Sequence, residues 1–235
     1  MSGNVSKPII TDGLITYLDA ANTDSYSGNG TVWNDLRGNS INGILYNGVG
    51  FNSNNRRSMI LDGTNDYIKF SNSSKLDLNT FSYSCWYYPT AYNQYNTIFS
   101  REYSRHYLLF NSAGRYIIFL RGNNYVAGGS FESSIGSNGL ASLNNWSYVT
   151  VNIDWPNGTF SVYHNTSLVW SLTNTNLGTS FLFPNLENST IGNRYNGTGS
   201  QRFIGNINYF KYYNRILSQS EILQNYNSTK GKFGL

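Results

Sequence analysis

The chain has 235 residues, of which 16% are aromatic and only 12% are charged. So many aromatic residues exclude intrinsic disorder, because disordered chains lack the apolar surface that offsets the entropy cost of ordering. The formal net charge of +4 comes from few groups, and no basic cluster is dense enough to indicate a nucleic-acid partner. No apolar run has the length of a transmembrane helix or a secretory signal. We therefore expect a soluble folded domain with no nucleic-acid or membrane partner.

Short alternating runs of apolar and polar residues, separated by Asn, Gly and Ser, predict β-strands along most of the chain. The clearest run is 81–88, which ends at Pro89 because proline cannot donate to a strand ladder. In chain order, the predicted strands are 58–61, 67–70, 81–88, 97–100, 107–110, 115–120, 146–153, 159–163 and 204–213. Strands this frequent, with no helices between them, predict an all-β fold, either an antiparallel sandwich or a barrel.

Two connections carry the residues of tight turns. Segments 62–66 and 155–158 contain Asp-Gly and Asn-Gly pairs, which supply the positive φ that a tight hairpin demands. We interpret both segments as hairpin turns.

One helix is predicted, over residues 218–226. Ser218 and Glu221 have capping-box spacing, so each side chain can reach the free backbone N–H of the other. Leu217, just before the cap, can pack onto Ile222. This helix is expected to close the domain.

No linker or internal repeat divides the chain, so we expect an N-terminal arm over residues 1–11 and one domain over residues 12–235. Ile9 and Ile10 are hard to explain in a free tail. They either anchor the arm to the sheet edge of a neighbour or complete the sheet of this domain. The sequence favours neither alternative.

The order of several motifs resembles the laminin-G-like, concanavalin A-like jelly-roll domains, and the resemblance covers nearly the whole chain. In the first half the motifs are 13–21, 61–68 and 81–86. In the second half they are 146–151, 163–165, 191–194, 203–207 and 213–222. The resemblance implies a two-sheet antiparallel jelly-roll sandwich with one short C-terminal helix.

The opening segment 13–22 and the ending 226–235 are similar to laminin-G-like domains in structural proteins of tailed bacteriophages. This likeness implies a non-enzymatic virion component, made in the host bacterial cytoplasm and displayed on a head, tail or fibre. Its expected partners are other virion proteins, in multiple copies. A single cysteine, Cys85, fits synthesis in a reducing compartment. The alternative from a different class is a free carbohydrate-binding lectin.

The fold also hosts glycosidases, so catalysis needs a separate argument. Retaining glucanases of this fold carry Glu-X-Asp-X-Glu on one strand, because alternate residues face the same cleft. None of the four glutamates has a carboxylate two residues away; they are Glu102, Glu132, Glu187 and Glu221. His106, in a predicted loop, and His164, at a strand end, are interpreted as surface residues, and Cys85 as a packed thiol. We predict no enzymatic activity.

A cofactor is not expected, although many relatives bind calcium. In related pentraxin-like domains the loop after the Ile-Gly pair carries acidic ligands, and here Arg194 stands in that loop. Asn208 and Tyr209 replace the acidic pair of the family. Asp62 and Asp66 remain weak metal candidates, with hydrogen bonding inside their own turn favoured.

Loops rich in aromatic residues are the candidates for ligand binding. Aromatic faces can stack on sugar rings, and neighbouring arginines can donate to hydroxyl groups. A protein interface is the alternative, because tyrosine gathers there as well. The candidate residues are Tyr92, Tyr95, Arg101, Tyr103, Arg105, Arg194 and Tyr195. The expected ligand is a host-surface glycan or a partner protein.

Overall fold

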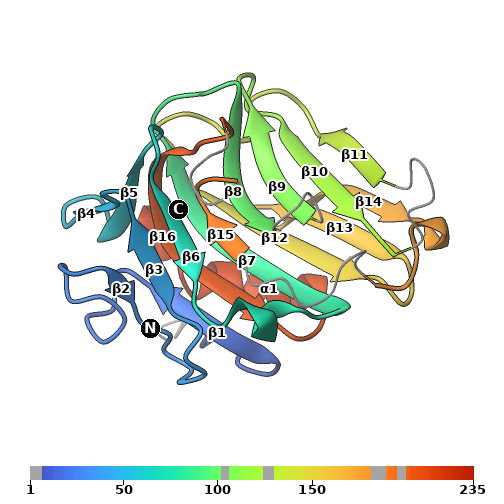
Figure 1. Ribbon diagram of the computed structural model, residues 1–235, viewed down its shortest axis with the longest axis horizontal. Coiled ribbons are helices and arrows are strands. Elements are labelled where there is room, and N and C mark those ends of the chain that lie inside the picture. Colours follow the sequence, from blue (N-terminus) through green and yellow to red (C-terminus); the bar gives the residue numbers. More distant parts are fainter. Residues whose placement is uncertain (1–6, 102–105, 124–129, 181–188, 195–199) are drawn as a thin grey trace, which may run out of the picture.

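The computed structural model describes residues 7–101, 106–123, 130–180, 189–194 and 200–235. Two antiparallel sheets pack face to face in these residues (Figure 1). The expected jelly-roll sandwich is therefore confirmed. No helix in these ranges is long and apolar enough to cross a membrane.

The first sheet contains the longest strands of the molecule. Its members are β1 (Leu14–Asp19), β4 (Gly50–Asn52), β5 (Ser58–Asp62), β7 (Thr80–Pro89), β12 (Ser147–Asp154), β13 (Thr159–His164), β14 (Ser167–Thr173) and β16 (Ile204–Tyr213). Their order is β14-β13-β12-β7-β16-β5-β4, and β1 pairs with the other half of β16. The run with the clearest alternation in the sequence, 81–88, forms β7 at the centre of this order.

The second sheet lies over the first (Figure 1). Its members are β2 (Val32–Trp33), β3 (Gly43–Tyr46), β6 (Tyr67–Phe70), β8 (Tyr95–Arg101), β9 (His106–Asn111), β10 (Tyr116–Arg121), β11 (Ser130–Ile135) and β15 (Ser189–Ile191). Their order is β11-β10-β9-β8-β15-β6-β3-β2. Every predicted strand is present, and most of the strands that were not predicted are short or lie at sheet edges.

The core between the sheets is mainly aromatic. Tyr83 on β7 meets Phe99 on β8, with ring centroids 4.7 Å apart, so it joins the two sheets. The hydroxyl of Tyr83 also lies 2.8 Å from Nε2 of His106. His106 was expected on a surface loop, and this was wrong, because it begins β9 and is fully buried. Burial lowers the pKa of its imidazole to about 3, which makes it a neutral core residue.

The two predicted hairpin turns have different outcomes. Residues 155–158 join β12 to β13, which pair antiparallel, so this hairpin is confirmed. Residues 62–66 join β5 of the first sheet to β6 of the second, so the prediction of a hairpin at 62–66 was wrong. Turn chemistry reverses the chain without deciding which sheet receives the next strand. Asp62 and Asp66 nevertheless hydrogen-bond within their own turn: Thr64 N–H donates to Asp62 Oδ1 at 2.7 Å, and Asp62 N–H donates to Asp66 Oδ2 at 3.1 Å.

The helix α1 (Gln219–Asn227) covers the outer face of the first sheet. Its capping box is confirmed, with Glu221 N–H donating to Ser218 Oγ at 3.3 Å and Ser218 N–H donating to Glu221 Oε2 at 2.8 Å. Leu217 and Ile222 lie buried in the same apolar cluster, as expected. Three 3₁₀ turns complete the described elements: η1 (Ser73–Leu76), η2 (Thr175–Leu177) and η3 (Lys230–Phe233).

The described part of the N-terminal segment lies against α1. Asn225, which is fully buried on the helix, accepts a hydrogen bond from Ile10 N–H at 2.8 Å. The Tyr213 hydroxyl donates to Ile10 O at 3.1 Å, and Ile9 and Ile10 pack on the helix cluster. The two isoleucines thus contact their own domain, although not as a strand of its sheet. Residues 1–6 lie outside the described ranges, and the boundary at residue 11 stays a prediction.

Candidate ligand-binding site

Strands β9 and β10 carry apolar side chains on both faces. Leu108 and Ile118 point into the core, whereas Tyr107, Ile117 and Phe119 form a separate cluster on the outer face of the second sheet. Such two-sided apolar strands are typical of sheets covered on both faces. The outer face of this part of the sheet therefore holds an apolar floor, where most antiparallel sheets expose polar residues to water.

The floor is built from stacked rings and guanidinium groups. Tyr107 and Phe119 are cross-strand partners with ring centroids 4.9 Å apart and planes at 9°. The guanidinium of Arg194 lies 4.2 Å from the Tyr107 centroid, and that of Arg121 lies 5.4 Å from the Phe119 centroid. Stacking on aromatic rings restrains both guanidinium groups.

Polar groups converge on the same floor from two sides. Glu132 on β11 stands directly opposite Phe119 and accepts a hydrogen bond from the Tyr107 hydroxyl. From the other side, Arg194 Nη1 donates to Gln201 Oε1 at 2.8 Å. Together these groups enclose a hollow of about 230 Å³, lined by Tyr95, Tyr107, Leu109, Ile117, Glu132, Arg194 and Gln201. It offers a carboxylate, an amide and a restrained guanidinium, above floor residues Tyr107, Leu109 and Ile117 that are at most 7% exposed.

Of the seven residues that the sequence nominated, the hollow contains Tyr95 and Arg194. Tyr92 is half-buried against the core, where its hydroxyl donates to Ala141 O at 2.6 Å. Arg101 is 2% exposed, so it cannot take part in a surface site. Tyr103, Arg105 and Tyr195 lie outside the described residues.

Arg101 is held between the sheets by polar groups. It ends β8, and its guanidinium donates to Leu76 O and forms an ion pair with Asp77. The Tyr212 hydroxyl donates to the same carbonyl at 2.9 Å. A buried guanidinium needs such partners because desolvation of an unpaired charge is costly. Its role is therefore structural.

The sequence interpretation missed Tyr107, Ile117, Glu132 and Gln201. The signal for the first two was present, because runs 107–110 and 116–120 are apolar at odd and even positions alike. An exposed outer face would have been polar at every second residue. Glu132 and Gln201 had no local signal, since they come from the edge strand β11 and from a connection.

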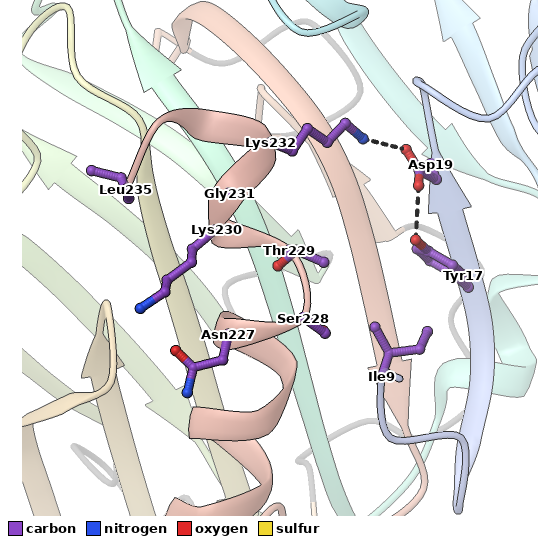
Figure 2. Close-up of a pocket in the computed structure, with 10 residues that line it drawn as sticks. All are labelled: Ile9, Tyr17, Asp19, Asn227, Ser228, Thr229, Lys230, Gly231, Lys232 and Leu235. Carbon is purple, nitrogen blue, oxygen red and sulfur yellow. Dashed lines mark hydrogen bonds and ion pairs between the residues drawn. The ribbon is translucent and has the colours of Figure 1, made fainter. Parts of the chain in front are cut away.

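A second hollow, of about 640 Å³, lies elsewhere (Figure 2). It separates Ile9, Tyr17 and Asp19 from the segment 227–235. Figure 2 shows Lys232 and Tyr17 directed at Asp19, which binds Lys232 Nζ at 3.2 Å and the Tyr17 hydroxyl at 2.8 Å. Because these polar groups already satisfy one another, we interpret this hollow as part of the packing between the N-terminal segment 9–19 and the C-terminal segment 227–235.

Lys211 lies buried on β16 near this hollow. Its side chain is fully buried, and its ammonium sits 4.1 Å from the Tyr209 ring centroid and 5.0 Å from that of Tyr17. Burial lowers its pKa from 10.5 to about 7, against the effect of the Asp19 carboxylate, which raises it. The lowered pKa of Lys211 requires that its ammonium group stay shielded from water.

Within the described ranges, no three His, Cys, Asp or Glu side chains gather to hold a metal ion. Burial raises the pKa of Asp66, which disfavours the charged form that a cation would need. Burial likewise raises the pKa of the Cys85 thiol, which lies in the core with Tyr83 and Tyr87. The surroundings of Asp66 and Cys85 are therefore those of structural residues.

Residues 62–223, more than half of the chain, match a family model described as the concanavalin A-like lectin/glucanases superfamily. The chain belongs to this superfamily. No curated protein matches its sequence. The matched range contains every described residue that lines the hollow on the second sheet, from Tyr95 to Gln201.

Solved structures with the same fold come from several kinds of protein. The binding domain of Paraclostridial Mosquitocidal Protein 1 gives a TM-score of 0.71 at 14% identity, covering 92% of this chain and 52% of that one. Trypanosoma rangeli sialidase in complex with the inhibitor DANA gives 0.70 at 14% identity, covering 97% and 36%. Domain 4 of AbnA, a GH43 extracellular arabinanase from Geobacillus stearothermophilus, in complex with arabinotriose, gives 0.65 at 17% identity, covering 90% and 97%.

These TM-scores show a shared fold, and at such low identities they show the fold alone. The concanavalin A-like domain spans about a third of the sialidase chain and about half of the toxin binding domain. It spans nearly all of the arabinanase domain.

Proposed function

We propose that this domain is a non-enzymatic carbohydrate-binding module of a bacteriophage virion, and that it binds sugar in the hollow on the second sheet. One observation carries the binding proposal: the polar groups of Glu132, Arg194 and Gln201 converge in one hollow, over the buried side chains of Tyr107 and Ile117. A few convergent polar groups fix the orientation of a ligand in a small-molecule site.

The chemistry of the hollow suits a sugar ring. The rim of a pyranose carries hydroxyl groups that both donate and accept hydrogen bonds. Glu132 accepts, Arg194 donates, and Gln201 does both. A volume of about 230 Å³ is below the usual range for drug-sized ligands, so the hollow suits a single terminal sugar unit.

Solved structures support a binding role for this fold. The AbnA domain is in complex with arabinotriose, and the binding domain of botulinum neurotoxin DC occurs in complex with SialylT. The same neurotoxin domain also occurs with rat synaptotagmin II. A protein receptor is therefore the alternative ligand class that the experiments must separate.

The absence of enzymatic activity remains part of the proposal. Most glycoside hydrolases need two carboxylates that flank the scissile bond. Among the described residues that line the hollow, Glu132 is the only carboxylate. Binding without turnover is the expected behaviour.

Binding can be tested on a glycan array with the purified domain. The wild type should bind a defined set of glycans, and free sugar should inhibit that binding. Glu132→Gln and Gln201→Ala should each weaken binding about tenfold, the equivalent of roughly 1.4 kcal/mol. The matched controls Asp24→Asn and Gln219→Ala, exposed residues away from the hollow, should bind normally. A folded wild type that binds no glycan would refute the proposal.

The virion location rests on the likeness of residues 13–22 and 226–235 to phage structural proteins. Mass spectrometry of purified virions should detect the chain in multiple copies per particle. Its absence from virions, combined with positive glycan binding, would instead support the free-lectin alternative.

A further inference from the structure

Three side chains from distant parts of the chain meet beside the hollow of Figure 2. The ammonium nitrogen of Lys232, on η3, lies 3.1 Å from Asn208 Oδ1 and 3.2 Å from Asp19 Oδ1. Asp19 ends β1 and Asn208 lies in β16, and the pairing of these two strands brings them together, with Ala20 N–H donating to Asn208 O at 2.9 Å. One amine therefore contacts both a carboxamide and a carboxylate.

Asn208 is held in one orientation by the backbone around it. It is the extra residue of a bulge in the pairing of β16 with β7, and a bulge re-aims the side chain that it carries. Asn208 is fully buried, and its Nδ2 donates to Arg56 O at 2.7 Å and to Arg57 O at 2.9 Å. Because both partners of Nδ2 are acceptors, they fix the amide with its Oδ1 toward Lys232.

Asp19 is restrained in the same way. Ala21 N–H donates to its Oδ1 at 2.9 Å, and the Tyr17 hydroxyl donates to its Oδ2 at 2.8 Å. Its side chain is 14% exposed and that of Lys232 is 32% exposed, so their contact is largely shielded from water. The carboxylate of Asp19 is therefore a fixed proton acceptor beside the Lys232 nitrogen.

The contact between Lys232 and Asn208 brings together two groups that can react. An uncharged lysine amine is a nucleophile, and the carbonyl carbon of an asparagine side chain is an electrophile. Groups that a folded chain holds in contact react as if they were present at a very high concentration, so a reaction too slow between separate molecules becomes accessible.

We propose that Lys232 and Asn208 form an intramolecular isopeptide bond, with Asp19 as the proton carrier. Lys232 Nζ attacks Asn208 Cγ, a C–N bond forms, and the bond from Cγ to Nδ2 breaks. Nζ loses two of its three protons, the first to Asp19, and the leaving nitrogen gains two. The products are a side-chain amide and an ammonium ion, so atoms and charge balance without an oxidant or a co-reactant.

The surroundings of Asn208 suit the departure of its nitrogen. The carbonyl oxygens of Arg56 and Arg57 already accept from Nδ2, so they can also accept from the ammonium ion that it becomes. The new bond would tie η3 to β16 and hold the C-terminal segment 227–235 against the first sheet. The reaction uses no residue that lines the hollow on the second sheet, so it is independent of sugar binding.

Mass spectrometry of the intact full-length chain tests the proposal. After incubation at about pH 8.5, where amines lose protons more readily, the wild type should be lighter than its sequence by one ammonia, about 17 Da. Lys232→Arg should keep its full mass, because a guanidinium stays protonated and cannot attack. Lys230→Arg is the matched control and should lose ammonia normally, since Lys230 lies over the Tyr226 ring. Near-ultraviolet circular dichroism should show that each variant is folded.

A tryptic digest identifies the bond itself. Closure of an asparagine side chain onto its own backbone also releases ammonia, but it joins no two peptides. The isopeptide bond should yield residues 203–211 linked to residues 231–235, and Asp19→Asn should form this linked peptide far more slowly.

Three results would contradict this chemistry. A folded wild type that keeps its full mass after prolonged incubation would overturn the proposal. A loss of ammonia that persists in Lys232→Arg would overturn it as well, because the lysine would then take no part. Cross-linking of Asp19→Asn at the wild-type rate would overturn the role of Asp19.

Discussion

The hydroxyl of Tyr107 donates a hydrogen bond to the carboxylate of Glu132, and this bond links β9 to β11 over the intervening strand β10. It fixes the only carboxylate that lines the described hollow. Tyr107→Phe keeps the ring stack and removes the bond. We expect a stability loss of about 1 kcal/mol in urea unfolding and weaker sugar binding in calorimetry.

Tyr46→Phe is the matched control for this prediction. Tyr46 is 38% exposed and stacks on Tyr67 at a centroid distance of 4.7 Å. Loss of the Tyr46 hydroxyl should change neither stability nor sugar binding. Unchanged binding by Tyr107→Phe would show that orientation of Glu132 does not matter to the ligand.

The buried ion pair between Arg101 and Asp77 should dominate the contribution of charges to stability. Asp77→Asn leaves a buried guanidinium without its counter-ion and should cost about 3 kcal/mol. Asp12, whose side chain is 85% exposed, pairs with Arg215 at 2.8 Å. Asp12→Asn should cost well under about 1 kcal/mol. Equal losses in the two variants, measured by chemical denaturation, would contradict the structural role of Arg101.

Lys211 should make stability depend on pH. Its pKa is about 7 in the folded protein and 10.5 as the ordinary value, so between these values the unfolded state binds a proton that the folded state does not. Stability should therefore rise with pH, by up to about 1.4 kcal/mol per unit, between about pH 7.5 and pH 8.5. At higher pH the unfolded state loses protons from Cys85 and from the tyrosines, whose pKa values burial raises in the folded protein, and stability should fall. Lys211→Met should remove this slope, whereas Lys69→Met should keep it. Parallel stability profiles for wild type and Lys211→Met would contradict the assignment.

Gly205 allows β16 to approach β7. Its φ is 141°, and a Cβ added there would lie 2.1 Å from the backbone oxygen of Tyr88. Because that oxygen belongs to the paired strand, it cannot move aside without breaking the ladder. Gly205→Ala should cost more than about 3 kcal/mol. Gly231→Ala, with no atom within 4 Å of the added Cβ, should be nearly neutral in thermal unfolding.

Truncations test the N-terminal segment. Removal of residues 1–7 spares the Ile10 hydrogen bond to Asn225 and should leave unfolding unchanged. Removal of residues 1–10 deletes that bond and both isoleucines, which should cost about 3 kcal/mol. If the shorter truncation is stable but absent from virions, residues 1–7 anchor the protein. Its normal incorporation would refute an anchoring arm.

Local patterns predicted the elements that are determined locally. The capping box at Ser218 and Glu221 and the alternation of residues 81–88 both involve neighbours in sequence. Short strands such as β2 and β15 escaped prediction because two or three residues carry too little periodicity. Residues 62–66 showed a turn, but the sheet reached by the next strand depends on packing far along the chain.

The candidate site was only partly predictable for a related reason. Arg101 looked like a loop residue because its counter-ion, Asp77, lies 24 positions away. Arg194 and Tyr95 come together only because β15 pairs with β8. Glu132 and Tyr107, 25 positions apart, meet only after β9, β10 and β11 have paired.

Hydrogen exchange with and without a bound glycan is the most direct test of the sugar-binding hollow. Saturating sugar should slow exchange in β9 and β10, at residues 106–111 and 116–121, and leave residues 219–235 unchanged. Protection confined to residues 219–235 would place the ligand in the hollow of Figure 2 instead, and this result would contradict the assignment of the site to the second sheet.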